Sequence, residues 1–148
     1  MSRILLVDDE KAVKWAVQEA LKEFGYDVET ANSGEEGLMK ASEERFDLIV
    51  SDLRMPGISG LEMLKDLKKD QPELRAIICS AYGSMESVVE AMRLGVNDFM
   101  VKPFKLAALM KAITDILGLP GEGKDDGGEK SGGNEKMPTE VFSPPTSS

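Results

Sequence analysis

Short runs of apolar, largely β-branched residues alternate five times with longer amphipathic segments between residues 3 and 117. The short runs predict strands, because each is four or five residues long and stops near a polar or glycine-containing turn. The predicted strands are residues 4–7, 28–31, 48–51, 76–80 and 98–101. The first, third and fourth runs are almost continuously apolar, so these three strands are expected to be buried on both faces of a sheet.

Between the strands, apolar residues recur with the period of a helix. These positions are Val13, Ala16, Val17, Ala20, Leu21 and Phe24, then Leu61, Met63, Leu64 and Leu67, then Met85, Val88, Val89 and Met92. Gly25 and Gly95 are placed to end the first and fourth helices, and Ser33 with Glu36 predicts a capping box at the start of the second. Because strands joined through helices are parallel, the pattern predicts an α/β fold: a doubly wound, five-stranded parallel sheet with five helices.

The composition changes near residue 118. Residues 119–148 contain six glycines, four prolines and six acidic residues but few apolar ones, so this segment has too little to bury to offset the entropy of ordering. We expect one folded domain at residues 1–118, followed by a disordered tail or linker at residues 119–148. No output domain is expected within this sequence.

Charge and composition exclude several classes of protein. The chain has 18 basic and 27 acidic residues, a net charge of −9, and therefore no general attraction for nucleic acid. It has no histidine, which excludes histidine metal sites and histidine-activated nucleophiles. The single cysteine, Cys79, lies in an apolar run and predicts a buried thiol without a disulfide. No signal peptide or membrane-spanning run is present, so a cytoplasmic location is expected.

Reactive side chains stand at four of the predicted strand ends. Asp8 and Asp9 follow the first strand, Asp52 follows the third, Ser80 ends the fourth and Lys102 follows the fifth. The carboxyl ends of parallel strands meet at one edge of a sheet, so these residues are expected to converge. Three adjacent carboxylates repel one another unless a cation neutralises them, and Mg²⁺ prefers such oxygen ligands together with phosphate oxygens.

The convergence also predicts a reaction. Asp8 and Asp9 are paired on one strand as metal ligands, whereas Asp52 is free to attack a phosphoryl group and form an aspartyl phosphate. Lys102 and Ser80 would then donate to the transferring phosphoryl oxygens.

Four segments together resemble the receiver domain of two-component response regulators, of the kind found in chemotaxis regulators. They are residues 4–10, 47–60, 80–83 and 98–104. The resemblance implies a flavodoxin-like fold with strand order 2-1-3-4-5. It also implies that Asp52 is the phosphoacceptor, and that Asp8, Asp9 and Asp52 bind Mg²⁺ together with the backbone carbonyl of Arg54. Lys102 and Ser80 would contact the phosphoryl group.

The same resemblance implies a switch and its partners. On phosphorylation, Ser80 moves toward the phosphoryl group, Phe99 turns inward, and the face formed by residues 84–117 changes. The donor would be the phosphohistidine of a sensor histidine kinase or a phosphotransfer protein. The changed face would contact an output protein or domain, or a second copy of the chain. Such a domain is not an enzyme with a separate substrate, although it assists its own phosphorylation and dephosphorylation. Trp15 is predicted to be exposed and suits a docking contact.

Four other interpretations compete with this one. A dehalogenase-type phosphatase needs an Asp-x-Asp pattern and a cap, and neither is present. A nucleotide-binding P-loop needs a Gly-Lys pair that does not follow Gly57 and Gly60. A pseudo-receiver that is never phosphorylated would be expected to lack one of the five strand-end residues, yet all are present. The receiver fragment of a longer transcription regulator remains open.

Overall fold

The computed structural model describes residues 2–81 and 83–119. The strands are β1 (Arg3–Val7), β2 (Asp27–Ala31), β3 (Leu48–Asp52), β4 (Ala76–Ser80) and β5 (Asp98–Val101). The helices are α1 (Lys11–Glu23), α2 (Gly34–Glu43), α3 (Gly60–Asp70), α4 (Met85–Leu94) and α5 (Leu106–Leu117). Beyond Leu119, the predicted tail lies outside the described residues.

The five strands form one parallel sheet in the order β2-β1-β3-β4-β5, which confirms the predicted fold. Along the central strands, Val7 pairs with Ser51 and Asp52 pairs with Cys79. Ser80 pairs with Val101 at the end of β4. The carboxyl ends of β1, β3, β4 and β5 therefore lie at one edge of the sheet.

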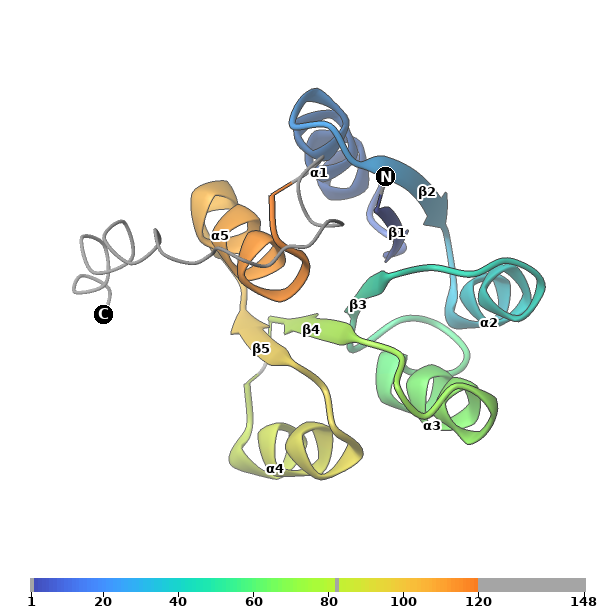
Figure 1. Ribbon diagram of the computed structural model, residues 1–148. Helices are drawn as coiled ribbons and strands as arrows, with labels where there is room; N and C mark the ends of the chain where they lie inside the picture. Colours follow the sequence, from blue (N-terminus) through green and yellow to red (C-terminus); the bar gives the residue numbers. More distant parts are fainter. Residues whose placement is uncertain (1, 82, 120–148) are drawn as a thin grey trace.

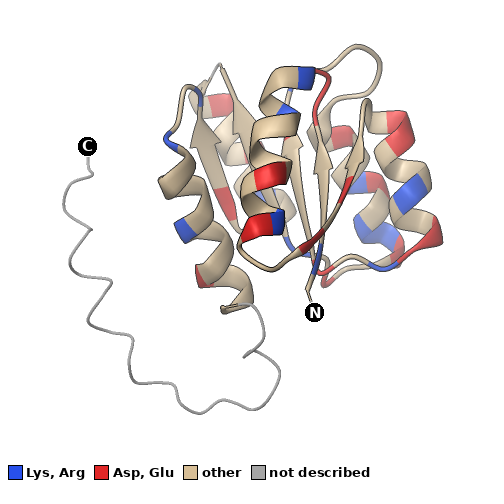
Figure 2. Ribbon diagram, turned by 90° about the horizontal axis from the view of Figure 1, so that it is seen from above, with Lys and Arg blue, Asp and Glu red and all other residues tan. Residues whose placement is uncertain are grey.

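Helices cover both faces of the sheet (Figure 1). On one face, α1 and α5 bury Val17, Leu21, Leu109 and Ile113 against the strands. On the other face, α2, α3 and α4 enclose a second core that includes Met63 and Leu64 from α3. Lysine, arginine and acidic residues are spread over the helices, the loops and parts of the strands (Figure 2). Within the described residues, no helix combines the length and the apolar character that crossing a membrane requires.

Two helix starts differ from the predicted capping. Ser33 accepts a hydrogen bond from the Glu36 backbone N–H at 3.1 Å, but the Glu36 carboxylate accepts from Asn32 N–H rather than from Ser33. The reciprocal capping box is instead at α3, where Ser59 accepts from Glu62 N–H and Glu62 accepts from Ser59 N–H. The expected C-terminal glycine of α4 is confirmed, since Gly95 has φ = 94°.

The predicted core-facing stripe of α4 is wrong. Met85 is 76% exposed, Met92 is 48% exposed and Val89 is also exposed, whereas Ala91 is the buried residue of α4 in the described chain. Leu94, at the end of α4, packs partly buried against the same core, so the side of α4 that carries Ala91 and Leu94 faces the sheet. Phe24, predicted on the buried stripe of α1, is likewise 45% exposed, because it lies beyond the last helical turn.

Candidate functional site

Three carboxylates meet at the carboxyl edge of the sheet. Asp8, Asp9 and Asp52 each offer one oxygen, and these oxygens all lie within 4.8 Å of one another. Asp8 is buried, Asp52 is partly buried and Asp9 is exposed. The strands position this cluster, because β1 and β3 are adjacent and end at the same level. Hard oxygen donors that are partly open to solvent are the ligand set that suits Mg²⁺.

Lys102 places its ammonium among these acids. Its Nζ lies 3.4 Å from Asp8 Oδ2, 3.4 Å from Asp52 Oδ1 and 3.3 Å from Glu10 Oε1. Burial by itself would lower the pKa of Lys102, but the negative charges of Asp8 and Asp52, together with the hydrogen bonds to Glu10 and Asp52, outweigh burial and raise the pKa. Lys102 is therefore held as a cation that faces the phosphoacceptor candidate.

The Asp52 carboxyl has a pKa above its ordinary value. Burial is the main cause, and the charge of Asp8 adds to it, while the Lys102 ammonium acts in the opposite direction. A carboxylate in this position carries a desolvation cost that a bound cation would relieve.

Backbone contacts fix the acid-bearing loop after β1. Asp8 Oδ1 accepts from the Glu10 N–H at 2.9 Å, and the Asp8 carbonyl accepts from Lys14 Nζ at 3.2 Å. The buried Lys14 ammonium also donates to the Asn32 side chain, so it ties the loop after β1 to the loop after β2. Neither Glu10 nor Lys14 was predicted from the sequence as a site residue. Their roles depend on which distant groups they reach, and no local pattern encodes that.

The first residue of α3 packs tightly against the end of β3. The Gly60 N–H donates to the Leu53 carbonyl at 2.9 Å, and a Cβ at Gly60 would lie 2.3 Å from the Asp52 carbonyl oxygen. Glu35, from the first turn of α2, accepts from the Ile58 N–H at 3.2 Å. The start of α3 and the start of α2 therefore hold the loop that follows the phosphoacceptor candidate.

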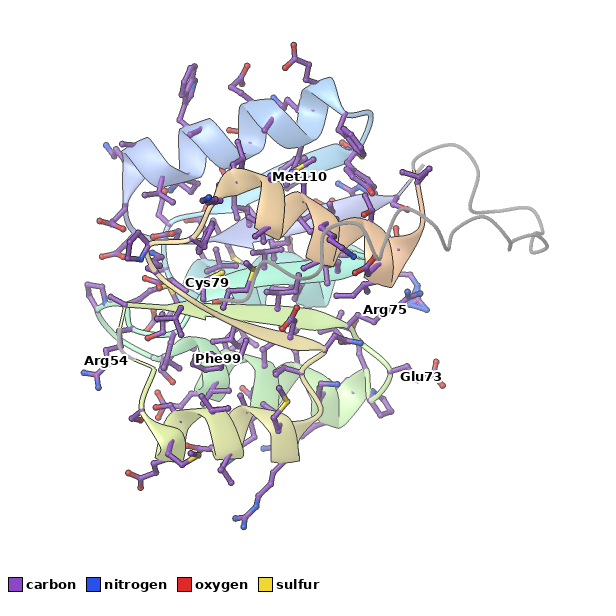
Figure 3. The ribbon with its side chains drawn as sticks, turned by 90° about the vertical axis from the view of Figure 1, so that its left-hand side faces the viewer. Arg54, Glu73, Arg75, Cys79, Phe99 and Met110 are labelled. Carbon is purple, nitrogen blue, oxygen red and sulfur yellow. The ribbon has the colours of Figure 1, made fainter. Side chains whose placement is uncertain are left out.

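The remaining predicted residues differ in their burial. Ser80 is buried at the end of β4, and its carbonyl accepts from the Lys102 N–H at 2.7 Å. Phe99 packs partly buried against the core on the α3 and α4 side, and Cys79 lies on the opposite face of the sheet (Figure 3). The Arg54 side chain points outward at the site's end of the molecule, and the predicted ligand is its backbone carbonyl. Trp15 is 65% exposed on α1, as predicted.

The family model of the response regulator receiver domain matches residues 4–114. The chain belongs to this family. Receiver domains are signalling domains of two-component systems and bind Mg²⁺ at an acidic site, which accords with the Asp8, Asp9 and Asp52 cluster. Phosphorylation-dependent signalling is therefore the general role of this receiver chain, and response regulators interact with histidine kinases and output domains.

Relatives of two different lengths match this receiver. The chemotaxis protein CheY of Thermotoga maritima is 32% identical over 115 residues, which are 77% of this chain and 96% of CheY. The transcriptional regulatory protein GlrR of Escherichia coli is 40% identical over 116 residues, which are 78% of this chain but 26% of GlrR. The chain thus spans about a quarter of the length of the response regulator protein FleR and of the transcriptional regulatory proteins GlrR and ZraR.

A solved structure agrees with the observed fold. The response regulator TrrA of Thermotoga maritima, in complex with Mg²⁺-BeF, is 35% identical, with a TM-score of 0.72. The similarity covers 79% of this chain and all of TrrA, at 100%.

Proposed function

We propose that this receiver is a switch that accepts a phosphoryl group on Asp52 from a phosphohistidine of a sensor histidine kinase or a phosphotransfer protein. The observation that carries the proposal is the position of the Lys102 ammonium, which lies 3.4 Å from both Asp8 and Asp52 at the edge of the carboxylate cluster. A cation there can balance the charge of a phosphoryl group that joins Asp52. A cytoplasmic location is part of the proposal.

In the proposed reaction, an Asp52 carboxylate oxygen forms a bond to phosphorus while the phosphorus–nitrogen bond of the donor breaks. The donor imidazole leaves with the electron pair of that bond and takes up a proton. Lys102 donates to one phosphoryl oxygen, and the Ser80 hydroxyl is proposed to donate to another. Attack by water on phosphorus later restores the Asp52 carboxylate and releases inorganic phosphate.

Mg²⁺ is proposed to bind to Asp8, Asp9, Asp52 and the Arg54 carbonyl. Bound there, it would offset the negative charge of the carboxylates and of the arriving phosphoryl group. The donor set supports this assignment, because three carboxylate oxygens within 4.8 Å of one another repel strongly without a divalent cation.

The output is proposed to pass through the face formed by α4, β5 and α5. The Ser80 hydroxyl would move to the phosphoryl group and Phe99 would turn toward the space that it leaves. Met85 and Met92 on α4 and Val101 on β5 are exposed apolar residues on this face, which suits contact with an output protein, an output domain or a second copy. Trp15 on α1 is proposed to contribute to donor docking.

The test is the intact mass of the protein after incubation with Mg²⁺ and acetyl phosphate. We expect a gain of one phosphoryl group that disappears with a chelator and in Asp52→Asn. A folded protein that gains no phosphoryl group from acetyl phosphate or from a cognate kinase would contradict the proposal. It would instead support an interaction module that is never phosphorylated.

A second candidate is the receiver portion of a transcription regulator. It is favoured by the match to GlrR, of which the receiver chain spans 26%. In this case residues 1–118 are proposed to be the receiver domain and residues 119–148 a linker to an output domain.

A further inference from the structure

Glu10 occupies an unusual place at the start of α1. It is the N-cap residue of the helix, but its carboxylate makes no capping hydrogen bond. Its Oε1 instead lies 3.3 Å from Lys102 Nζ, which is 92 residues away in the chain. The hydrogen bond from Glu10 N–H to Asp8 Oδ1 holds the Glu10 backbone in place and leaves its side chain free to reach the ammonium.

The three carboxylates around Lys102 differ in how freely they can move. The side chains of Asp8 and Asp52 are 7% and 11% exposed, whereas the Glu10 side chain is 60% exposed. In the proposed reaction the Lys102 ammonium contacts the phosphoryl group on Asp52. One of the carboxylates that now contact Lys102 must therefore give up its contact. Glu10 can do so by rotating into solvent, because it is the most exposed of the three.

We propose that Glu10 restrains phosphorylation of Asp52, and this inference rests on the proposed function. In the unphosphorylated state Glu10 competes for Lys102, and its charge also opposes the approach of an anionic donor. The Glu10 carboxylate thereby lowers the rate at which Asp52 is phosphorylated. Exposed ion pairs of this kind change an equilibrium by a factor of about two to five, which sets the size of the expected effect.

The first measurement is the rate of phosphorylation with Mg²⁺ and a small donor. Glu10→Gln should be phosphorylated by acetyl phosphate about two to five times faster than the wild type. The rate increase in Glu10→Gln should be smaller with phosphoramidate as the donor, because phosphoramidate carries less negative charge than acetyl phosphate. Glu10→Asp keeps the negative charge but has a shorter side chain. Its phosphorylation rate should therefore lie between the rates of the wild type and of Glu10→Gln. Glu43→Gln removes one exposed charge at the end of α2 and should leave the rate unchanged.

The second measurement tests the contact itself without metal or phosphate. The ¹⁵Nζ and ¹³Cε NMR signals of Lys102 should shift in Glu10→Gln and stay in place in Glu43→Gln. The proposal is overturned if Glu10→Gln is phosphorylated no faster than the wild type, or if the Lys102 signals do not respond. If no variant takes up phosphate while the Lys102 signals respond, the proposed function fails, and the restraint fails with it although the contact is real.

Discussion

Replacing Gly60 with alanine is the sharpest structural test of how the phosphoacceptor candidate is held. An added Cβ would lie 2.3 Å from the Asp52 carbonyl oxygen and 2.9 Å from Ser51 Oγ. A main-chain oxygen cannot rotate away as a flexible side chain can, so either the end of β3 or the start of α3 must move. The Ser59 capping box and the Gly60 to Leu53 hydrogen bond resist that movement.

Two opposing effects set the size of the change. Overpacking against backbone costs about 3 kcal/mol, while alanine is the better helix former by about 1 kcal/mol, so the net loss of unfolding free energy is about 2 kcal/mol. For a domain of this size the melting temperature should fall by about 8 °C. The control is Gly95→Ala, where φ is 94° and the nearest atom to the new Cβ is Lys68 Nζ at 3.6 Å.

Gly95→Ala should cost about 1 kcal/mol, because alanine is strained in the left-handed region although it meets no clash. The assay is thermal and urea unfolding followed by circular dichroism, in the absence of Mg²⁺. The reasoning is refuted if Gly60→Ala is destabilised no more than Gly95→Ala. It would also be refuted if Gly60→Ala were destabilised but phosphorylated at the wild-type rate, because Asp52 would then not depend on this packing.

Three further predictions concern charge in the site. Asp52→Asn should unfold at a higher temperature than the wild type at neutral pH in a chelator; because the folded pKa of Asp52 is raised, the two stabilities should converge as the pH falls and Asp52 takes up a proton. Lys102→Met removes the cation beside Asp8 and Asp52 and should lower the unfolding free energy in a chelator by about 2 kcal/mol, with a larger recovery on adding Mg²⁺ than in the wild type. Burial raises the pKa of the Cys79 thiol to about 12, so a thiol reagent at pH near 8 should modify Cys79 in denaturant but not in the native protein.

The fold was predictable because its strands and helices are encoded by short stretches of consecutive residues. The strands β1, β3 and β4 are buried along nearly their whole length, and such apolar runs stand out in a sequence. Strand ends follow from these runs, and parallel pairing then brings Asp8 and Asp52 to one edge. The resemblance added the strand order, which the periodicity alone did not determine.

The errors have a physical explanation as well. The apolar period of α4 correctly predicted a helix but not which side faces the sheet, because apolar residues lie on more than one side of it: Ala91 is buried, whereas Met85 and Met92 are exposed. In the site, the strand ends predicted that Lys102 and Asp8 converge, but no pattern in the sequence predicted the contacts of Glu10 or Lys14. Long side chains reach groups that are set by loop geometry, and neither residue type nor spacing specifies such contacts.

The packing of the helices suggests why a change at Asp52 would reach α4 rather than α3. α3 buries Leu61, Met63, Leu64 and Leu67, whereas α4 buries Ala91 and has Leu94 partly buried against the core. A helix with so little buried apolar area shifts at a lower free-energy cost. β5 lies next to this weakly held helix and leads directly into Lys102, whose N–H is bound to the Ser80 carbonyl. Movement of Lys102 or Ser80 toward a phosphoryl group would therefore displace the ends of β4 and β5, which lie beside α4. The weakly packed α4 would shift in response, together with its exposed methionines.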